Sequence, residues 1–299
     1  MFFSVGSASN AYADEWSISY GMGTRTDALR WAIAADLAGS LPNIMSELTW
    51  RDLNGAERSI GLIYESTDNW MARALYQEVD FTHSGEVQDS DYNTDNRTGE
   101  YSRSLSATRG SSALSITTLI GPLFFLNDEQ TLIMTPLLGF AHQISDLRMN
   151  NGVQIIDTIS PQNVGPFSGL NSSYRAQFDS RIAGIETRWW LTRQLGIEMQ
   201  WQHQWFNYRA EADWNKRSEF QHPLSFYQNG LGENNQWTLK LLAKLNRHWE
   251  FDAAYTQTRG GLQNGRDVSM LANGAREITR LNEVDFASTA LSMMVKYTF

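Results

Sequence analysis

Cysteine is absent from the 299-residue sequence, and basic residues are in the minority. The lack of cysteine excludes a disulfide framework and a thiolate metal site, although it does not identify a cellular compartment. The formal net charge is -9 and the pI is about 5.1. A nucleic-acid-binding function needs a basic surface, so no nucleic-acid partner is expected.

Long hydrophobic runs are also absent. No stretch of 18 consecutive apolar residues occurs, so the sequence predicts no transmembrane helix. The mean hydropathy is only -0.41. This low value is still compatible with a transmembrane β-barrel, because only alternate residues of a barrel strand face lipid. Eleven Trp and eleven Tyr are present, and these are the side chains that gather at membrane interfaces.

The first thirteen residues are interpreted as the remainder of a signal peptide. They contain Phe2-Phe3, then small residues, then Ala11-Tyr12-Ala13 before Asp14, which has the A-x-A form of a cleavage site. The basic segment that normally begins such a signal is missing, so Met1 is interpreted as internal to a longer precursor. The alternative is a short disordered N-terminus. Residues 14–299 are expected to form one domain.

A hydrophobic period of two is sustained over long segments and predicts strands. One face of the segment 195–205 carries Leu195, Ile197, Met199, Trp201, His203 and Trp205, and the other face is polar. Similar alternation occurs in 237–245, 249–256 and 291–299. Strands of soluble sandwiches usually have about five or six residues. Strands of about ten residues or more are typical of a tilted membrane strand.

The expected connections between strands alternate between short and long. Four short turns lie at 67–69, 127–129, 192–194 and 246–248, and five longer polar loops lie near 35–43, 83–99, 150–172, 212–234 and 261–280. Nine connections join ten strands, and both termini then fall on the short-turn side, which is periplasmic in such barrels. We therefore predict an all-β fold, a ten-stranded antiparallel transmembrane β-barrel of up-and-down topology, located in the bacterial outer membrane.

Two further features support this interpretation. The last residue, Phe299, ends an alternating strand on the lipid-facing register, as in the sorting signal of outer-membrane barrels. Charges of both signs fall on the opposite register, where they are expected to pair inside the barrel. These residues are Glu186, Arg188, Glu198, Lys240, Lys244, Glu250, Asp252 and Lys296.

Three segments resemble the omptin family of ten-stranded outer-membrane endopeptidases, which have a cleft at the top of the barrel. The segment Ser46-Glu47-Leu48-Thr49-Trp50 resembles the second omptin strand. Val87-Gln88-Asp89-Ser90-Asp91-Tyr92 is similar to the Asp-x-Asp-aromatic motif of the second outer loop. The ending Lys296-Tyr297-Thr298-Phe299 is similar to the omptin C-terminus. The resemblance implies an omptin-like barrel.

The resemblance also implies a site in which water is activated between an aspartate pair and an Asp-His dyad. The pair corresponds to Asp89 and Asp91, and an ungapped count places the dyad on Glu211-Ala212-Asp213. Asp213 then stands where the histidine is expected. Histidine accepts a proton near neutral pH, and an aspartate is a far weaker base. Four facing carboxylates would raise one another's pKa values or hold a hard cation. The candidate site is therefore an acidic extracellular cleft.

Other side chains enter as alternatives. His222 and His83 lie in expected outer loops and are candidates for a relocated base. Omptins bind lipopolysaccharide through basic residues on the barrel wall, which implies outer-membrane lipid or lipopolysaccharide as a partner and leaves Arg148 and Arg175 as phosphate contacts. No phosphate-binding glycine loop or nucleophile elbow occurs, so no cofactor is expected.

Three classes of function remain open. The first is a non-proteolytic surface barrel of omptin shape whose loops bind an extracellular peptide or cation. The second is an omptin-type endopeptidase that uses the Asp89 and Asp91 pair with a relocated histidine. The third is a small pore, which ranks last because ten strands leave little lumen once side chains fill it. A correctly placed histidine would distinguish the first two.

Overall fold

The computed structural model describes residues 14–83 and 85–299, so the expected signal segment 1–13 lies outside the described residues. In these residues fourteen strands form one antiparallel sheet. A single short 3-10 helix, η1 (Pro161–Asn163), is also described. The strands are β1 (Glu15–Ile33), β2 (Ser46–Glu65), β3 (Trp70–His83), β4 (Glu86–Thr94), β5 (Thr98–Ala107), β6 (Ser111–Pro122), β7 (Phe124–Phe125), β8 (Leu132–Asp157), β9 (Gly165–Pro166), β10 (Asn171–Trp190), β11 (Leu195–Asp213), β12 (Phe226–Lys244), β13 (Trp249–Met270) and β14 (Arg276–Thr298).

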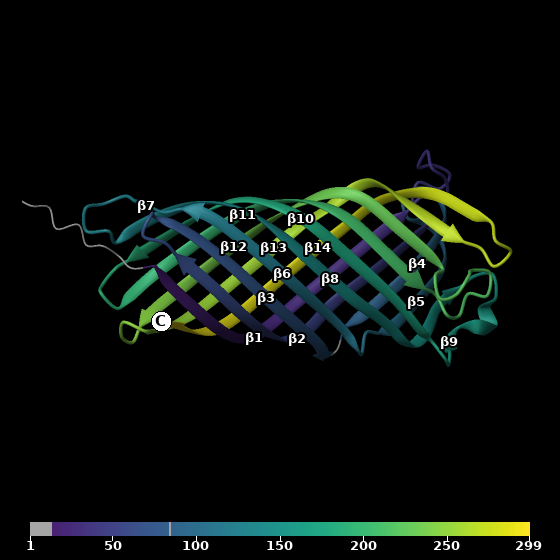
Figure 1. Ribbon diagram of the computed structural model, residues 1–299. Coiled ribbons are helices and arrows are strands. Elements are labelled where there is room, and N and C mark those ends of the chain that lie inside the picture. Colours follow the sequence, from purple (N-terminus) through teal and green to yellow (C-terminus); the bar gives the residue numbers. More distant parts are fainter. Residues whose placement is uncertain (1–13, 84) are drawn as a thin grey trace, which may run out of the picture.

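The sheet closes on itself because β1 pairs with both β2 and β14. Pairing follows a ring of ten strands: β1, β2, β3, β6, β8, β10, β11, β12, β13 and β14. Figure 1 shows the strands running obliquely around a long closed wall. The hairpin β4–β5 and β9 lie at one end of this wall, and β7 and the C-terminus lie at the other.

The hairpin β4–β5 extends the wall beyond β3 and β6, toward the end that carries the long loops. Strand β2 pairs with β3 along 54–65 and with β4 along 46–51. Strand β8 pairs with β6 along 138–146 and with β5 along 150–157. Strands β3 and β4 therefore follow one another beside β2, and β5 and β6 do so beside β8. The short strands β7 and β9 pair only with β8.

The four predicted short turns are confirmed, and they lie at 66–69, 126–131, 191–194 and 245–248. The expected loop at 83–99 is wrong, because β4 and β5 occupy most of it. The loops expected at 212–234 and 261–280 are also too long. The observed loops are 214–225 and 271–275, because the strands stay paired with their neighbours beyond the lipid-facing segments. The other two long-end loops are 34–45 and 158–170.

The polarity of each long strand reverses along its length, as β11 shows. From Leu195 to Trp205 the outward side chains are mainly apolar and the inward ones are mainly polar. Beyond this point the outward side chains are Asn207, Arg209, Glu211 and Asp213, and the inward ones are Phe206, Tyr208, Ala210 and Ala212. A membrane strand needs only about 9–11 residues, and β11 has 19. Its second half is therefore built like a strand of a soluble protein.

The inward apolar side chains of these upper halves form one core that fills the barrel near its long-loop end. Aromatic rings dominate this aromatic plug. The ring centroids of Trp50 and Tyr174 are 5.0 Å apart, and those of Trp31 and Phe226 are 5.7 Å apart. Closer to the short-turn end, Phe178 contacts Phe206, and their ring centroids are 5.2 Å apart. The wall of the upper barrel thus encloses a packed core rather than an open channel.

Charged pairs occupy the lower lumen, as the inner-face register predicts. Arg188 lies 3.1 Å from Glu65 and 3.2 Å from Glu198, and Lys240 lies 2.6 Å from Glu198. Lys296 pairs with Glu250. Because buried charges need partners, this network is consistent with a structural role for the lumen charges. Among the described residues, no helix is both long and apolar enough to cross a membrane.

Candidate functional site

A pocket of about 570 Å³ opens at the long-loop end, directly above the aromatic plug. It lies between the hairpin β4–β5, the loop 158–170 and the loop 214–225, and we call it the mouth pocket. Met149, Leu170 and Trp214 give it an apolar surface beside the plug, and all three belong to the plug or pack against it. Its polar side chains come mainly from β4, β5 and the two loops.

Asp89 and Asp91 are the inward carboxyl groups of this pocket. Val87 of the same strand belongs to the aromatic plug, and the alternation of β4 places positions 89 and 91 on the same face. Ser102 and Ser104 of the paired strand β5 line the pocket beside them. The structure therefore places both aspartates of the sequence motif on the inward face of β4, at the mouth.

The environment of the pair favours the protonated carboxyl groups. Burial raises the pKa of Asp89, and the neighbouring Asp91 carboxylate raises it further. Burial also raises the pKa of Asp91, although hydrogen bonds from Ser46 and Ser102 oppose this change. The positive charge of Arg217 lowers both pKa values without cancelling the effect of burial. Two close carboxyl groups in a partly dry site behave in this way because they cannot both ionise easily.

Glu211 and Asp213 do not join the aspartate pair in the mouth pocket. Both have odd numbers on β11 and belong to its outward register, and Glu211 is exposed. The inward positions at this height are Ala212 and Trp214, which carry no proton acceptor. The prediction that four carboxylates face one another in one cleft is therefore wrong, because Glu211 and Asp213 face outward. The correct register was available in the sequence, because Glu211 and Asp213 share the parity of the lipid-facing Trp201 and Trp205.

His222 is the partner of Asp213. Its Nδ1 atom lies 2.6 Å from Oδ1 of Asp213, and both side chains are partly exposed. Neither residue lines the mouth pocket. The outward-facing His142 lies 2.7 Å from Asp179, and His203 lies 3.4 Å from Glu233. The side chain of His83 falls outside the described part of the structure.

Arg217 is a candidate site residue that the sequence reasoning missed. It comes from the loop 214–225, lines the mouth pocket and acts electrostatically on both aspartates. Glu219 holds its guanidinium at 2.6 Å, and the ring of Phe220 lies 5.9 Å from the guanidinium carbon. No local motif marks this arginine, because its contacts to β4 arise only when the loop folds across the mouth. Lys216 and Asp157 add further charges of both signs.

Several solved structures are similar to this chain, to very different degrees. The chain is similar to the outer membrane protease OmpT from Escherichia coli, with a TM-score of 0.77, 12% identity, and coverage of 95% of this chain and 97% of that one. The translocator domain of the autotransporter NalP from Neisseria meningitidis gives a TM-score of 0.40, 10% identity and coverage of 97% and 90%. The outer membrane protein OprG from Pseudomonas aeruginosa gives 0.39, 11% identity and coverage of 96% of each chain.

The OmpT similarity shows an omptin-like fold, which the sequence resemblance predicts, and at 12% identity it shows the fold alone. No curated protein sequence matches the chain. A family model described as "Pom: Protochlamydia outer membrane protein" matches residues 19–299. The chain is therefore a bacterial outer-membrane β-barrel protein that belongs to the Protochlamydia outer membrane protein family.

Proposed function

We propose that this chain is a ten-stranded transmembrane barrel that acts as a non-proteolytic binding protein, with the mouth pocket as its extracellular site. One observation carries the proposal. The inward residue at the end of β11 is Ala212, which belongs to the aromatic plug, and Trp214, the first residue of the following loop, lines the mouth pocket. Neither side chain can accept a proton, which a peptidase of this shape would need at this place. The carboxyl pair of Asp89 and Asp91 faces Arg217 instead.

This arrangement suits binding better than hydrolysis. General-base catalysis needs an acceptor within hydrogen-bond reach of the attacking water. The positive charge of Arg217 lowers the pKa values of the two aspartates without cancelling the increase that burial causes, and a fixed cation beside them does not accept a proton from water. The long loops define the outer side of such barrels, so the pocket is expected to face the extracellular medium.

The chemistry of the pocket favours a peptide segment over a bare cation as the ligand. Asp89, Asp91 and Asp157 supply acidic groups, and Lys216 and Arg217 supply basic ones. Trp214 and its apolar neighbours provide a hydrophobic surface beside these charges. A peptide presents backbone polar groups, apolar side chains and charges together, whereas a bare cation would be repelled by the two basic residues.

The test is a peptide library incubated with purified protein in lipopolysaccharide-containing micelles. The wild-type protein should retain peptides without cutting them, and Asp89→Ala should retain fewer. Asp128→Ala, which changes an exposed carboxyl group in a turn at the other end, is the matched control and should bind as the wild type does. Cleavage by the wild type that is abolished in Asp89→Ala would reject the proposal.

An omptin-type endopeptidase is the second candidate function, and the pairing of Asp213 with His222 favours it. An aspartate bonded to Nδ1 orients an imidazole and leaves Nε2 available as a base. In this alternative the loop 214–225 would have to move so that His222 reaches the mouth pocket. Cleavage that is lost in both His222→Ala and Asp89→Ala would support the peptidase.

We also propose outer-membrane lipid or lipopolysaccharide as a partner of the outer wall. Arg175 projects outward from β10 in the polar part of the wall, beyond Arg181 and Asp179 toward the long-loop end, and Asp146 lies 3.3 Å from it. Arg148 lies two residues after Asp146 on β8 and also faces outward. Phosphate groups of lipopolysaccharide would compete with Asp146 for Arg175. Binding of lipopolysaccharide by wild type and by Arg175→Ala, measured in neutral detergent, tests this contact.

A further inference from the structure

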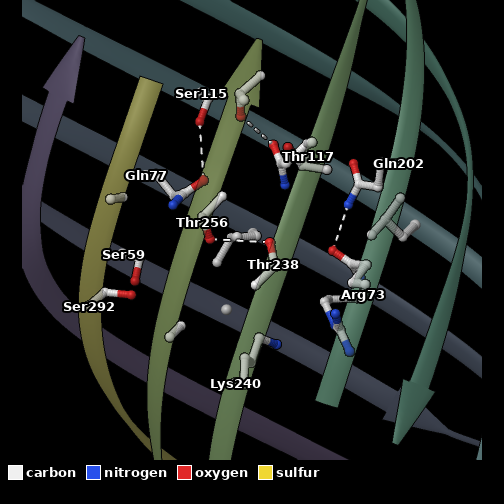
Figure 2. Close-up of a pocket in the computed structure, with 18 of the residues that line it drawn as sticks. Ser59, Arg73, Gln77, Ser115, Thr117, Gln202, Thr238, Lys240, Thr256 and Ser292 are labelled. Atoms are coloured by element: carbon white, nitrogen blue, oxygen red, sulfur yellow. Dashed lines mark hydrogen bonds between the residues drawn. The ribbon is translucent and has the colours of Figure 1, made fainter. Parts of the chain in front are cut away.

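The lumen below the aromatic plug contains a polar cavity of about 150 Å³, which we call the chamber. Figure 2 shows hydroxyl and amide side chains from several strands projecting into it, with Arg73 and Lys240 on its charged side. Thr238 and Thr256 lie 3.2 Å apart across neighbouring strands. The aromatic plug lies between the mouth pocket and the chamber. Phe178 of the plug and the neighbouring Phe286 line the chamber, and their ring centroids are 5.7 Å apart.

Within residues 14–83 and 85–299, side chains alone separate the chamber from the short-turn end. A second cavity of about 400 Å³, the vestibule, lies among the short turns and is lined by Trp190, Lys244 and His248. Ile63, Arg188, Glu250 and Lys296 line both the vestibule and the chamber. Long charged side chains can change rotamer far more easily than a packed aromatic core can open. The easier route into the chamber is therefore from the short-turn end.

The lumen around the chamber carries a slight excess of carboxyl groups, and the chamber holds unpartnered polar atoms. The described lumen carries six basic side chains, which are Arg25, Arg73, Arg188, Lys240, Lys244 and Lys296. It carries seven carboxyl groups, which are Asp27, Glu57, Glu65, Glu186, Glu198, Glu250 and Asp252. Asp252 is 5% exposed and lines the chamber, and its Oδ1 atom has no hydrogen-bond partner among the described atoms.

Three other atoms lining the chamber are also buried and unpartnered: Arg73 Nε, Gln143 Nε2 and Asn234 Oδ1. Buried polar groups in proteins are almost always satisfied by protein or water. We propose that the lumen is a one-ended chamber, which admits water and small cations from the short-turn end, attracts the cations through Asp252, and stops both at the aromatic plug. This role is independent of the mouth pocket and of which end faces the cell exterior.

The absence of native cysteine allows a direct test with single-cysteine variants. Thr238→Cys and Ser59→Cys place a thiol in the chamber, Ser104→Cys places one in the mouth pocket, and Asp128→Cys marks the short-turn end. Each protein is reconstituted in vesicles, and small methanethiosulfonate reagents, one cationic and one anionic, are added outside. A large impermeant maleimide that reacts with Ser104→Cys or Asp128→Cys reports which end faces outward.

The chamber thiols should react only in vesicles whose short-turn end faces the reagent, and the cationic reagent should react about tenfold faster or more than the anionic one. Asp252→Asn in the Thr238→Cys background should remove most of this preference, and Asp128→Asn should not. Reaction from the long-loop end, or no reaction of either chamber thiol in a folded protein, would overturn the one-ended chamber. An unchanged charge preference in Asp252→Asn would overturn the role of Asp252.

Discussion

Oδ1 of Asp213 lies 2.6 Å from Nδ1 of His222, outside the pocket that holds Asp89 and Asp91. This pair has the residue types of a catalytic dyad, but neither side chain lines the mouth pocket. We therefore expect His222→Ala to leave peptide processing as it is in the wild type, at a background level. If the loop did deliver His222 to the aspartates, the substitution would lower the cleavage rate by about 10² to 10⁴. Rates measured on peptides with basic residues distinguish these outcomes.

Asp213→His is also expected to be inactive, because position 213 belongs to the outward register of β11. Ala212→His is the informative comparison, since position 212 faces inward. If Asp213→His cleaved peptides and Ala212→His did not, the assignment of the two faces at the mouth would be wrong.

The orientation of the barrel predicts opposite behaviour for two epitope tags. A tag inserted at residue 160, in the loop 158–170, should be labelled by antibody on intact cells. A tag at residue 128, in a short turn, should be labelled only after the outer membrane is made permeable. Surface labelling at 128 but not at 160 would reverse the orientation.

Two phenylalanines separate the contribution of the aromatic plug from that of the lipid-facing wall. Phe178 is buried in the plug, and Phe140 is 65% exposed on the wall. Phe178→Ala should lower the free energy of unfolding by about 3–5 kcal/mol, because it leaves a cavity among packed rings. Phe140→Ala should have a much smaller effect. Unfolding midpoints in urea, measured in the same detergent, provide the comparison, and equal losses would contradict a packed plug.

The aspartate pair predicts that stability falls as pH rises. The pKa of Asp89 is raised by burial and by Asp91 to about 8, above the value of about 3.9 expected in an unfolded chain. The folded state therefore holds its proton more tightly, and this contribution, complete below pH 4, is lost between pH 4 and about 8. Thermal midpoints should show this decline in the wild type.

Asp89→Asn cannot ionise and should show a smaller decline over the same interval, whereas Asp128→Asn should follow the wild type. A wild-type midpoint that rises from pH 5 to pH 8, with Asp89→Asn flat, would mean that the carboxylate form of Asp89 is the more stable one in the folded protein.

The membrane-facing half of the fold was predictable because its signal is local. Alternation from Leu195 to Trp205 identifies a strand, its lipid face and its charged inner face, and polar turns such as 192–194 identify the short connections. The same reasoning was less accurate above Trp205, because the polar side chains there face outward and the alternation no longer marks a lipid face. The loop expected near 212–234 was therefore too long, since β12 already begins at Phe226.

The site was only partly predictable. Asp89 and Asp91 were identifiable because two like side chains at an interval of two must share a face of a strand. The position of Arg217 could not be predicted, since its approach to β4 depends on how the loop 214–225 packs against Phe226 and the rest of the aromatic plug. The misplacement of Glu211 had a different cause, because an ungapped count ignored the parity of β11.

The reversal of polarity between Trp205 and Asn207 also defines how deeply the barrel can sit in a bilayer. If the barrel sank into the bilayer by two residues of β11 or more, Asn207 and then Arg209 would enter the hydrocarbon. If it rose by a similar amount, Trp205 and then Trp201 would be exposed to water. The neighbouring β10 has a similar boundary, where Ile185 and Ala183 give way to Arg181 and Asp179, although Arg181 pairs with Trp205 and the change therefore comes one outward residue earlier. The side chains of the wall therefore determine where the lipid-facing surface ends. A loop that is lengthened, shortened or exchanged at the mouth should leave the immersion depth of the barrel unchanged.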